Sequence, residues 1–487
     1  MDTEDALSEE INVDGDVSCP VTDFSEAADV SRAQDCELYQ SLSSTDDLEQ
    51  LLAVTDTHLT ELSSINAALA LVRAARMVEA ERKLTGRKET SLAKNQRLLN
   101  LIRRVENIVL IETHRRQGIC VLDQDESEDS ASQASNEDQG LHMAWTIAAI
   151  CRGLGLLGGL LGYRNDDLLA NLASLAKPLL AQLTPHQLQN CLWAFASLGM
   201  KEPGPFFGAA VETIEPRMHD FSHESLVAIL TSFAMVKVFS ANLFDQAAEV
   251  LAKFCDDLRP QDISNCTWAF AILQHRHAEV FAGLGSSAAR RINAFKPEQV
   301  TLLVWAFAVM RWRCEELFQA VQDVVAEKHQ DFAPDCLANV LHAFALVGHR
   351  GSHVILEASA ECILQRLKEY SNKALAKLVF AMSKTRSYVN ERFFTEMAEE
   401  ILRRMDGIPT HLLTAMLVTF SKVPFDQTAF IQRAAEKARQ AIQEVESSAF
   451  VRLVKTFSAA PIEQTLAQDV AEEAVRRIPG LRASELV

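Results

Sequence analysis

One pattern recurs along most of the chain with a period of 37 or 38 residues. Each copy places small and large apolar side chains at helical spacing, as in LQNCLWAFASLG, ISNCTWAFAILQ and VTLLVWAFAVMR. The eight clear copies begin at Leu188, Leu226, Ile263, Val300, Leu337, Leu375, Leu413 and Phe450. A ninth, looser copy surrounds Trp145, and a Gly/Leu-rich insertion follows it. So regular a period predicts a repeat architecture and not one compact core.

Each copy carries the signals of two helices. The tripeptides LTP, LRP, FKP and FAP put Pro at a first helical position, where its missing N–H needs no partner, and Thr184 and Ser222 can cap free amides. A short break such as GMKEPG separates this helix A from a second amphipathic stretch, helix B. Because neither helix can bury its apolar stripe alone, the copies must stack. We therefore predict an all-α, right-handed α-solenoid of tandem helix pairs over residues 141–487.

The net charge of −19 is unevenly distributed. Residues 1–56 hold 16 acidic and 1 basic residue, which predicts a disordered acidic tail. Residues 57–120 hold 6 and 12, with apolar residues at helical intervals, which predicts a degenerate, repeat-like helical segment with a basic face. Residues 121–140 form an acidic, Ser-rich linker, and residues 141–487 are nearly neutral. The acidic total therefore does not exclude a nucleic-acid partner.

Neither a membrane nor a metal is expected as a partner. The longest apolar run, Leu154–Leu161, is far shorter than the roughly 20 residues that span a bilayer. The ten cysteines include no CxxC pair and no neighbouring His at zinc-finger spacing, so we expect reduced core thiols in a reducing compartment.

Helix A has two unlike sides. At 100° per residue, Leu188, Leu192 and Phe195 share one side, which we expect to be the core, and Asn190 and Trp193 lie on the opposite side, which can line a concave groove. The candidate RNA-binding residues of this stripe are Asn190, Trp193, Asn265, Trp268, Trp305, Asn339, His342, Lys377, Lys384, Arg452 and Lys455. Aromatic rings stack on unpaired bases, amides bond base edges, and lysine and arginine neutralise phosphate. The stripe thus predicts binding of single-stranded RNA.

The stripe also permits a structural interpretation. The tryptophans could wedge between adjacent A helices and set the superhelix, because a large apolar ring is usually at least half buried. The asparagines could be satisfied amides on the helix surface. Both interpretations stay open at the level of the sequence.

The copies WAFASLG, WAFAILQ and WAFAVMR, each preceded by a TP, RP or KP start and LxNxLW-like spacing, resemble the octotricopeptide repeat and related helical repeats of FAST-kinase-like organellar RNA-binding proteins. The resemblance covers residues 141–478 and, more loosely, 57–119. It implies binding to an organellar transcript in RNA processing, stability or translation, with protein partners in an RNA-processing complex, in a mitochondrion or plastid. It does not extend to the nuclease-like C-terminal domain of many such proteins, so it implies no cleavage. The acidic N-terminus has the wrong sign for a transit peptide.

Catalytic motifs are missing from the sequence. It contains no G-x-x-x-x-G-K-[ST], G-x-S-x-G or HExxH motif, and GLGLLGGLLG lacks the preceding strand of a dinucleotide loop. The pair His275 and His277 has no Cys or carboxylate at ligand spacing, so we expect it in a solvated turn. We therefore expect a binding protein, not an enzyme, without a cofactor.

Two further hypotheses remain. Stacked helix pairs also serve as protein-binding scaffolds of the armadillo or HEAT kind, and the near-neutral solenoid supports that alternative. The acidic segments could also compete with RNA for the basic helices of residues 57–120.

Overall fold

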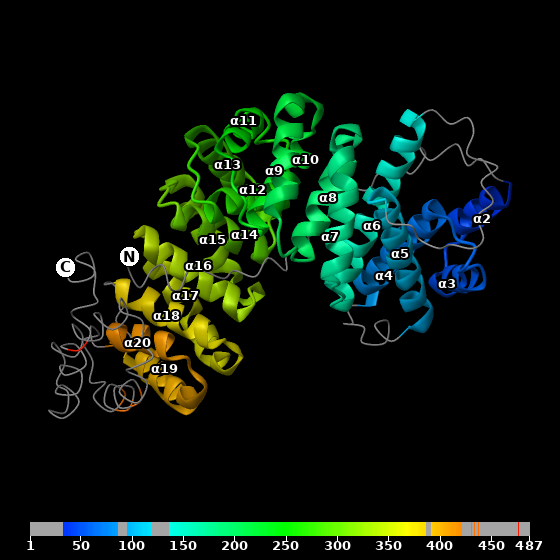
Figure 1. The fold of residues 1–487 in the computed structure, drawn as a ribbon. Coiled ribbons are helices and arrows are strands. Elements are labelled where there is room, and N and C mark those ends of the chain that lie inside the picture. The colour runs from blue at the N-terminus through cyan, green and yellow to red at the C-terminus, as the bar shows by residue number, and fades with distance from the viewer. Residues whose placement is uncertain are drawn as a thin grey trace. The chain divides into compact units, whose positions relative to one another are not determined.

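The computed structural model describes residues 33–85, 95–118, 136–385 and 391–420, and the single residues 430, 433, 437 and 476. Throughout these residues the regular secondary structure is helical, without a strand (Figure 1). The chain divides into two units. The N-terminal unit is Val17–Phe254, and the C-terminal unit is Cys255–Val487 together with Met1–Asp16.

The N-terminal unit stacks helix pairs in sequence order. Its helices are α2 (Ala33–Ser44), α3 (Leu48–Thr57), α4 (Ser64–Thr85), α5 (Gln96–Arg116), α6 (Asn136–Leu161), α7 (Asp166–Ala176), η2 (Lys177–Gln182), α8 (Pro185–Ser197), α9 (Gly204–Ile214), η3 (Glu215–Asp220), α10 (His223–Met235) and α11 (Ala241–Leu251), where η marks a short 3-10 helix. Helices α4, α6, α8 and α10 pack one on the next as A helices, and α3, α5 and α7 pack in the second layer.

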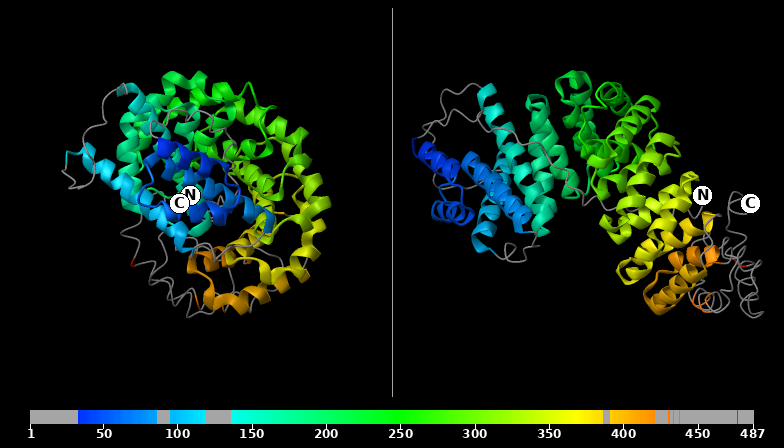
Figure 2. Two further views of the ribbon diagram at one scale, coloured as in Figure 1. Left: turned by 90° about the vertical axis from the view of Figure 1, so that its right-hand side faces the viewer. Right: turned by 180° about the vertical axis from the view of Figure 1, so that it is seen from behind.

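The C-terminal unit repeats this arrangement. Its helices are α12 (Pro260–Ile272), α13 (Ala278–Arg290), η4 (Ile292–Ala294), α14 (Pro297–Val309), α15 (Glu315–Lys328), η5 (His329–Asp331), α16 (Pro334–Val347), α17 (Ser352–Gln365), η6 (Leu367–Glu369), α18 (Asn372–Lys384), α19 (Glu391–Arg404), η7 (Met405–Gly407) and α20 (Thr410–Phe420). Figure 2 shows from two sides how these helices, coloured green to orange, follow one another in order. Each A helix packs on the next A helix and each B helix on the next B helix, as a helical solenoid requires.

The helix starts agree with the sequence prediction. Pro185, Pro260, Pro297 and Pro334 each begin an A helix. The Thr184 hydroxyl accepts a hydrogen bond from the Gln187 backbone amide, and the Gln187 side-chain oxygen accepts one from the Thr184 backbone amide. Ser222 caps α10. These side chains satisfy amides that the first turn leaves without helical partners.

Five A helices, α8, α10, α12, α14 and α16, are followed within two residues by a backbone conformation that favours glycine. The φ angle is 67° at Gly199 and 68° at Gly348, and 56°, 54° and 51° at Lys237, Gln274 and Arg311. In these five copies the next amide reaches back to a buried Phe carbonyl, for example Trp312 N to Phe307 O at 2.9 Å. This bond pattern closes the helix end as a Schellman motif.

Phenylalanine rings join the two layers. In three copies a ring from the B helix meets a ring of the next A helix edge to face, with centroid distances of 4.9 Å for Phe207 and Phe233, 5.3 Å for Phe281 and Phe307, and 5.0 Å for Phe318 and Phe344. Because the A-helix ring recurs at the repeat period from Phe195 to Phe344, this part of the core repeats with the sequence.

A basic residue at the end of many B helices fastens a copy to the one before it. Arg217 donates to the carbonyl oxygens of Ala181 and Leu183, and Arg366 donates to that of Phe332. Arg404 donates to the carbonyl oxygens of Tyr370 and Leu367 at 2.6 and 2.9 Å. These hydrogen bonds satisfy carbonyl groups in the turns between copies.

The structure corrects the predicted domain boundaries at two places. Part of the predicted acidic tail forms α2 and α3, whose Leu42, Leu51 and Leu52 are fully buried. Its acidic side chains pair with the basic segment, for example Glu49 and Asp56 with Arg97 at 3.6 and 3.9 Å. The local composition is typical of a disordered chain. The segment is nevertheless helical, because its few leucines pack against neighbouring helices.

The second correction concerns the acidic linker and the Gly/Leu-rich insertion. Helix α6 begins at Asn136, inside the predicted linker, and it runs on through the insertion to Leu161. Gly153 and Gly158 lie where a Cβ atom would meet the side chains of Leu71 and Leu198, at 2.8 and 2.1 Å. These glycines therefore let the neighbouring A helices approach α6. The copy that begins at Phe450 lies outside the described residues.

None of the described helices is both long and apolar enough to cross a membrane.

Candidate nucleic-acid interface

The predicted aromatic stripe lies in the seam between successive A helices. Trp193, Trp268, Trp305 and His342 are 9%, 5%, 4% and 1% exposed. The ring of His342 on α16 contacts that of Phe380 on α18, with 5.0 Å between centroids. Within the described residues, the buried Nε1 of Trp268 and of Trp305 and Nε2 of His342 have no hydrogen-bond partner. The rings therefore pack between copies and are not stacking platforms in an open groove.

The predicted amide stripe joins copies by hydrogen bonds. Asn190 on α8 accepts from Arg152 on α6 at 3.2 Å, and Asn339 on α16 accepts from Lys377 on α18 at 2.8 Å. Arg152 and Lys377 occupy the Asn190 position of their own copies, 38 residues away from their partners. Asn190 and Lys377 are buried, whereas Asn339 is half-buried. These side chains thus serve as contacts between copies.

In the copy at Ile263 the amide bonds run through a neighbour. Asn265, which is buried, accepts from Gln261 on its own helix at 2.8 Å. Gln261 in turn accepts from Gln299 on α14 at 2.8 Å. This chain of amides links α12 to α14.

Burial has changed the ionisation of two groups in the seam of the C-terminal unit. Burial lowers the pKa of His342 to about 3, with the Lys377 charge as a further cause, so His342 is neutral at pH 7. Burial lowers the pKa of Lys377 to about 8, against a favourable effect of Asp335. The low pKa of Lys377 follows because the amide of Asn339 stabilises its ammonium less than water would.

The remaining predicted residues lie elsewhere. Lys384 is exposed at the end of α18, with its Nζ 5.2 Å from the centroid of the Phe380 ring. Arg452 and Lys455 lie outside the described residues.

The burial of the stripe corrects the expectation that it lines an open groove. In α12 every residue from Asp262 to Ala271 is buried, and in α14 every residue from Gln299 to Ala308. A helical wheel identifies which residues share a side, but an A helix has an A neighbour before and after it as well as B helices behind it. The small side chains of WAFA let these neighbours close over the side that the wheel leaves open.

A second row of side chains lies on the edge where A helices turn into B helices. In three successive turns of the C-terminal unit, the residue after the left-handed position is a His or a Trp, and the residue after that is an Arg. We call this row the turn ladder, and its rungs are His275 with Arg276, Trp312 with Arg313, and His349 with Arg350. The rungs are 37 residues apart, which is the repeat period, so they occupy the same place in successive copies.

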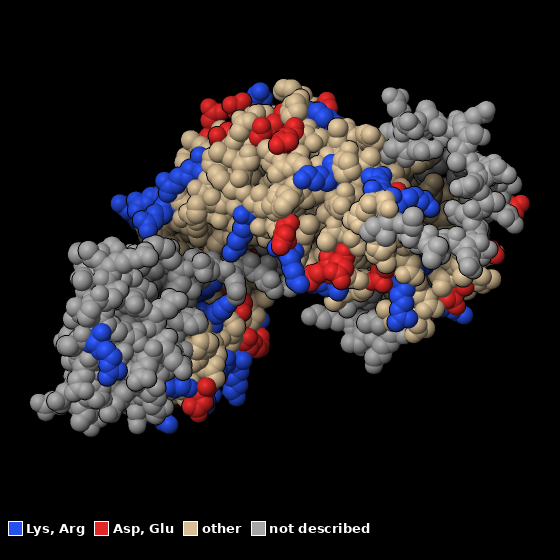
Figure 3. Space-filling model, viewed as in Figure 1, with Lys and Arg blue, Asp and Glu red and all other residues tan. Residues whose placement is uncertain are grey.

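The turn ladder combines aromatic rings with exposed positive charge. His275 lies over Phe270 with a 24° interplanar angle, and His349 lies over Phe318 at 26°. His275 and Trp312 are half-buried, and all three arginines of the ladder are exposed. The turns 273–277, 310–314 and 348–351 contain four Arg and no Asp or Glu. In Figure 3 several Lys and Arg side chains gather along the upper left margin of the described surface, beside α13 and α15.

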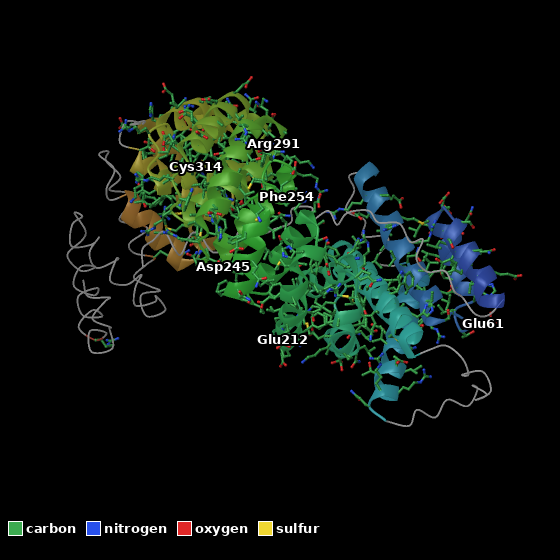
Figure 4. All side chains as sticks on the ribbon, turned by 90° about the horizontal axis from the view of Figure 1, so that it is seen from above. Glu61, Glu212, Asp245, Phe254, Arg291 and Cys314 are labelled. Carbon is green, nitrogen blue, oxygen red and sulfur yellow. The ribbon has the colours of Figure 1, made fainter. Side chains whose placement is uncertain are left out.

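A pocket of about 320 Å³ opens between the last two rungs. Its lining comes from the start of α15 and the turn before it, and from the end of α16 and the turn after it: Arg313, Cys314, Glu315, Phe318, Val347, Gly348, His349 and Arg350. Figure 4 labels Cys314, which lies directly before α15, and Arg291, which directly follows α13.

The histidine of this pocket has a defined orientation. Its Nδ1 accepts a hydrogen bond from the Gly351 amide at 3.1 Å, which assigns the ring proton to Nε2. That Nε2 lies 3.2 Å from Oε1 of Glu315, whose side chain is 78% exposed. Because Nε2 is itself buried, the group that the pocket presents is the exposed carboxylate of Glu315.

Sequence reasoning missed the turn ladder, although its pattern is visible there. His275 was expected in a solvated turn together with His277, but both are half-buried and the His275 ring stacks on a core Phe. The pattern that identifies the row is the recurrence of HR, WR and HR at the repeat period, just after the A helices.

Two basic side chains of residues 57–120 are used inside the fold. Arg73 donates to the Thr45 carbonyl oxygen, and Arg104 donates to those of Thr60 and Leu62. These two arginines therefore join α4 and α5 to the segment before α4.

The described cysteines include buried thiols, not joined in disulfides, at Cys151, Cys191, Cys255 and Cys266. Burial raises the pKa of Cys255 to about 11, so the unreactive protonated thiol dominates. In the part of the chain that the structure describes, no group of three or more His, Cys, Asp or Glu could hold a metal ion.

Residues 158–350 match the model of a protein family described as RNA-editing substrate-binding complex 6 protein. The matched segment begins inside α6 and ends at Arg350, so it includes the whole turn ladder. The match supports an RNA-associated helical-repeat family and does not single out the octotricopeptide repeat. No curated protein matched the sequence.

Proposed function

We propose that this chain binds single-stranded RNA and works as a non-catalytic RNA-binding subunit of an RNA-processing assembly. The observation that carries the proposal is the match of residues 158–350 to a family whose description names an RNA-editing substrate-binding complex. The stacked helix pairs support it, because such repeats offer a long surface along which an extended strand can lie. RNA editing is the process that the family description suggests for this assembly.

The proposal includes where and how the protein acts. The resemblance of the WAFA copies to organellar RNA-binding repeats favours a mitochondrion or a plastid and a transcript of that organelle as the ligand. Selectivity for sequence would come from base-edge contacts, because phosphate contacts alone do not distinguish bases. Proteins of the same assembly are the further partners that we propose.

The direct test measures binding of the full-length chain to a fluorescein-labelled single-stranded RNA of mixed sequence by fluorescence anisotropy. We expect binding in 50 mM KCl that weakens as KCl is raised to 200 mM, since phosphate contacts release counterions. Single-stranded RNA is expected to compete better than duplex RNA, because unpaired bases are open to stacking. Absence of binding in 50 mM KCl would refute the proposal.

The alternative function is a protein-binding scaffold of the armadillo or HEAT kind. The closed A-helix seam favours it, because a seam filled with packed rings and paired amides leaves no base-reading stripe on helix A. Near-neutral charge over residues 141–487 agrees with it as well. The anisotropy measurement separates the two functions, because a pure protein scaffold shows no salt-dependent affinity for RNA.

A further inference from the structure

We propose that the turn ladder is the RNA-contacting surface of the C-terminal unit, and that the pocket between its last two rungs receives one nucleobase. This inference rests on the proposed function and assigns a place to it. It moves the contact from the helix A stripe, which is buried, to the edge where A helices turn into B helices.

The ladder has the two properties that an extended RNA strand needs. An arginine at the same place in each of three successive copies, Arg276, Arg313 and Arg350, gives a row of positive charges that can follow a phosphate backbone. The half-buried rings of His275 and Trp312 lie directly before the first two arginines, whereas the ring of His349 is buried against Phe318 and Phe344. Basic side chains interleaved with rings are the arrangement by which proteins hold single strands.

The pocket matches a single nucleotide in size and chemistry. Its volume of about 320 Å³ is at the lower end of the range for small-molecule sites. Buried Phe318 and Val347 provide apolar walls of the pocket. The exposed residues Arg313 and Arg350 also line the pocket, one from each turn. A base can therefore enter between two arginines that are placed to hold its flanking phosphates.

The exposed carboxylate in the pocket fits a base edge better than a phosphate. Glu315 would repel a phosphate, but its carboxylate, 78% exposed, accepts hydrogen bonds from the amino or imino groups of a base. Nε2 of His349 is buried 3.2 Å from Oε1 of Glu315, so it lies beside the carboxylate and does not itself reach the base. We therefore expect the base edge at Glu315 and the phosphates at the arginines.

The backbone conformation of the turns also bears on this assignment. Gln274 and Arg311 occupy the left-handed conformation in which glycine is less strained, and Gly348 fills the equivalent position of the next copy. Arg311 therefore adds a positive charge beside the ladder at an energetic cost.

The test uses the full-length double variant Arg313→Ala/Arg350→Ala in the anisotropy assay. We expect the affinity for single-stranded RNA to fall by about tenfold or more at low salt. The slope of log affinity against log salt should also become shallower by ~1.4, since each phosphate contact to a single strand contributes ~0.7. The matched control is Lys368→Ala/Arg403→Ala, which removes two positive charges from exposed positions of the same unit outside these turns.

A second variant keeps a loss of binding separate from a loss of folding. Arg311→Gly removes a charge directly before the Trp312 rung and relieves the strained backbone, so the protein should be no less stable than the natural chain. Weaker RNA binding in this variant, at unchanged or higher melting temperature, is the expected result.

A cross-linking experiment locates the base. The full-length chain is irradiated with RNA that contains 4-thiouridine, and cross-linked peptides are identified by mass spectrometry. We expect cross-links in the segments around Trp312 and His349, and their loss in the Arg313→Ala/Arg350→Ala variant.

The outcomes separate the site from the function. If the natural chain binds RNA and both double variants bind it equally well, the ladder assignment is wrong although RNA binding stands. If the natural chain binds no RNA, both the proposed function and the ladder assignment are wrong. Selective loss in the ladder variant, with the control unchanged, supports the assignment.

Discussion

A Cβ atom added to Gly155 of α6 would lie 2.6 Å from Cζ3 of Trp193 in α8. The same atom would lie 3.2 Å from Cα of Ala194, so the backbones of the two helices approach closely as well. The Gly-rich stretch of α6 and the repeated tryptophan are thus two halves of one contact. The tryptophan position of this repeat is a packing position between copies.

We predict that Gly155→Ala destabilises the N-terminal unit. The new methyl group cannot coexist with the Trp193 ring, and overpacking of this kind costs about 1–3 kcal/mol, partly offset by the better helix propensity of alanine. Urea unfolding followed by circular dichroism measures the change. Gly159→Ala in the same helix is the control, because its Cβ would meet nothing within 4 Å, and it should leave stability unchanged or raise it by up to ~1 kcal/mol.

We predict that Trp305→Ala lowers the free energy of unfolding by about 3–5 kcal/mol, because it leaves a cavity in the seam between A helices. Trp305→Phe should lower the free energy of unfolding by less, since Phe380 occupies the same position in a later copy. Both are measured by urea unfolding. A Trp305→Ala protein with natural stability and weakened RNA binding would restore the open-groove interpretation.

We predict that stability rises between about pH 8 and pH 10.5 through Lys377. Its folded pKa of about 8 lies below its ordinary value of 10.5, so in this window the unfolded chain binds more protons, and raising the pH favours the folded state. Below pH 8 the buried charge costs roughly 3 kcal/mol at most.

Lys377→Met removes this titration. Relative to the natural chain, it should be more stable at pH 7, and this advantage should shrink as the pH approaches 10.5. Exposed Lys368→Met is the control and should follow the natural profile. Parallel profiles for the natural chain and Lys377→Met would contradict the buried-charge account.

We predict that Arg404→Ala costs about 2–3 kcal/mol, because Arg404 satisfies the carbonyl groups of Leu367 and Tyr370 in the preceding copy. The adjacent Arg403 is exposed and makes an ion pair with Glu400, so Arg403→Ala should change stability by less than ~1 kcal/mol. Thermal unfolding compares the two. Equal effects would mean that the carbonyl contacts do not fasten the copies.

The local parts of the fold could be predicted from the sequence. The position of Pro185 and the cap at Thr184 depend on a few neighbouring residues, and both are found where expected. The core side of helix A, with Leu188, Leu192 and Phe195 fully buried, follows from helical periodicity in the same way. The all-helical solenoid is confirmed in the described residues, whereas the handedness of its superhelix stays a prediction.

The candidate site was less predictable. The sequence established that Trp193, Trp268 and Trp305 recur at one position, but whether that position faced solvent depended on how closely the neighbouring A helices approach. Glycines such as Gly155, far from these tryptophans along the chain, set that distance in the N-terminal unit.

The sequence by itself determined the period, the helix pairs, the inner face of each helix and the turns that carry the arginines of the ladder. Only the tertiary structure decided which of the remaining faces stays open. Exposure is a property of neighbours, and in a stacked repeat those neighbours are supplied by other copies. Packing closed the tryptophan seam and left the arginines Arg276, Arg313 and Arg350 at the surface.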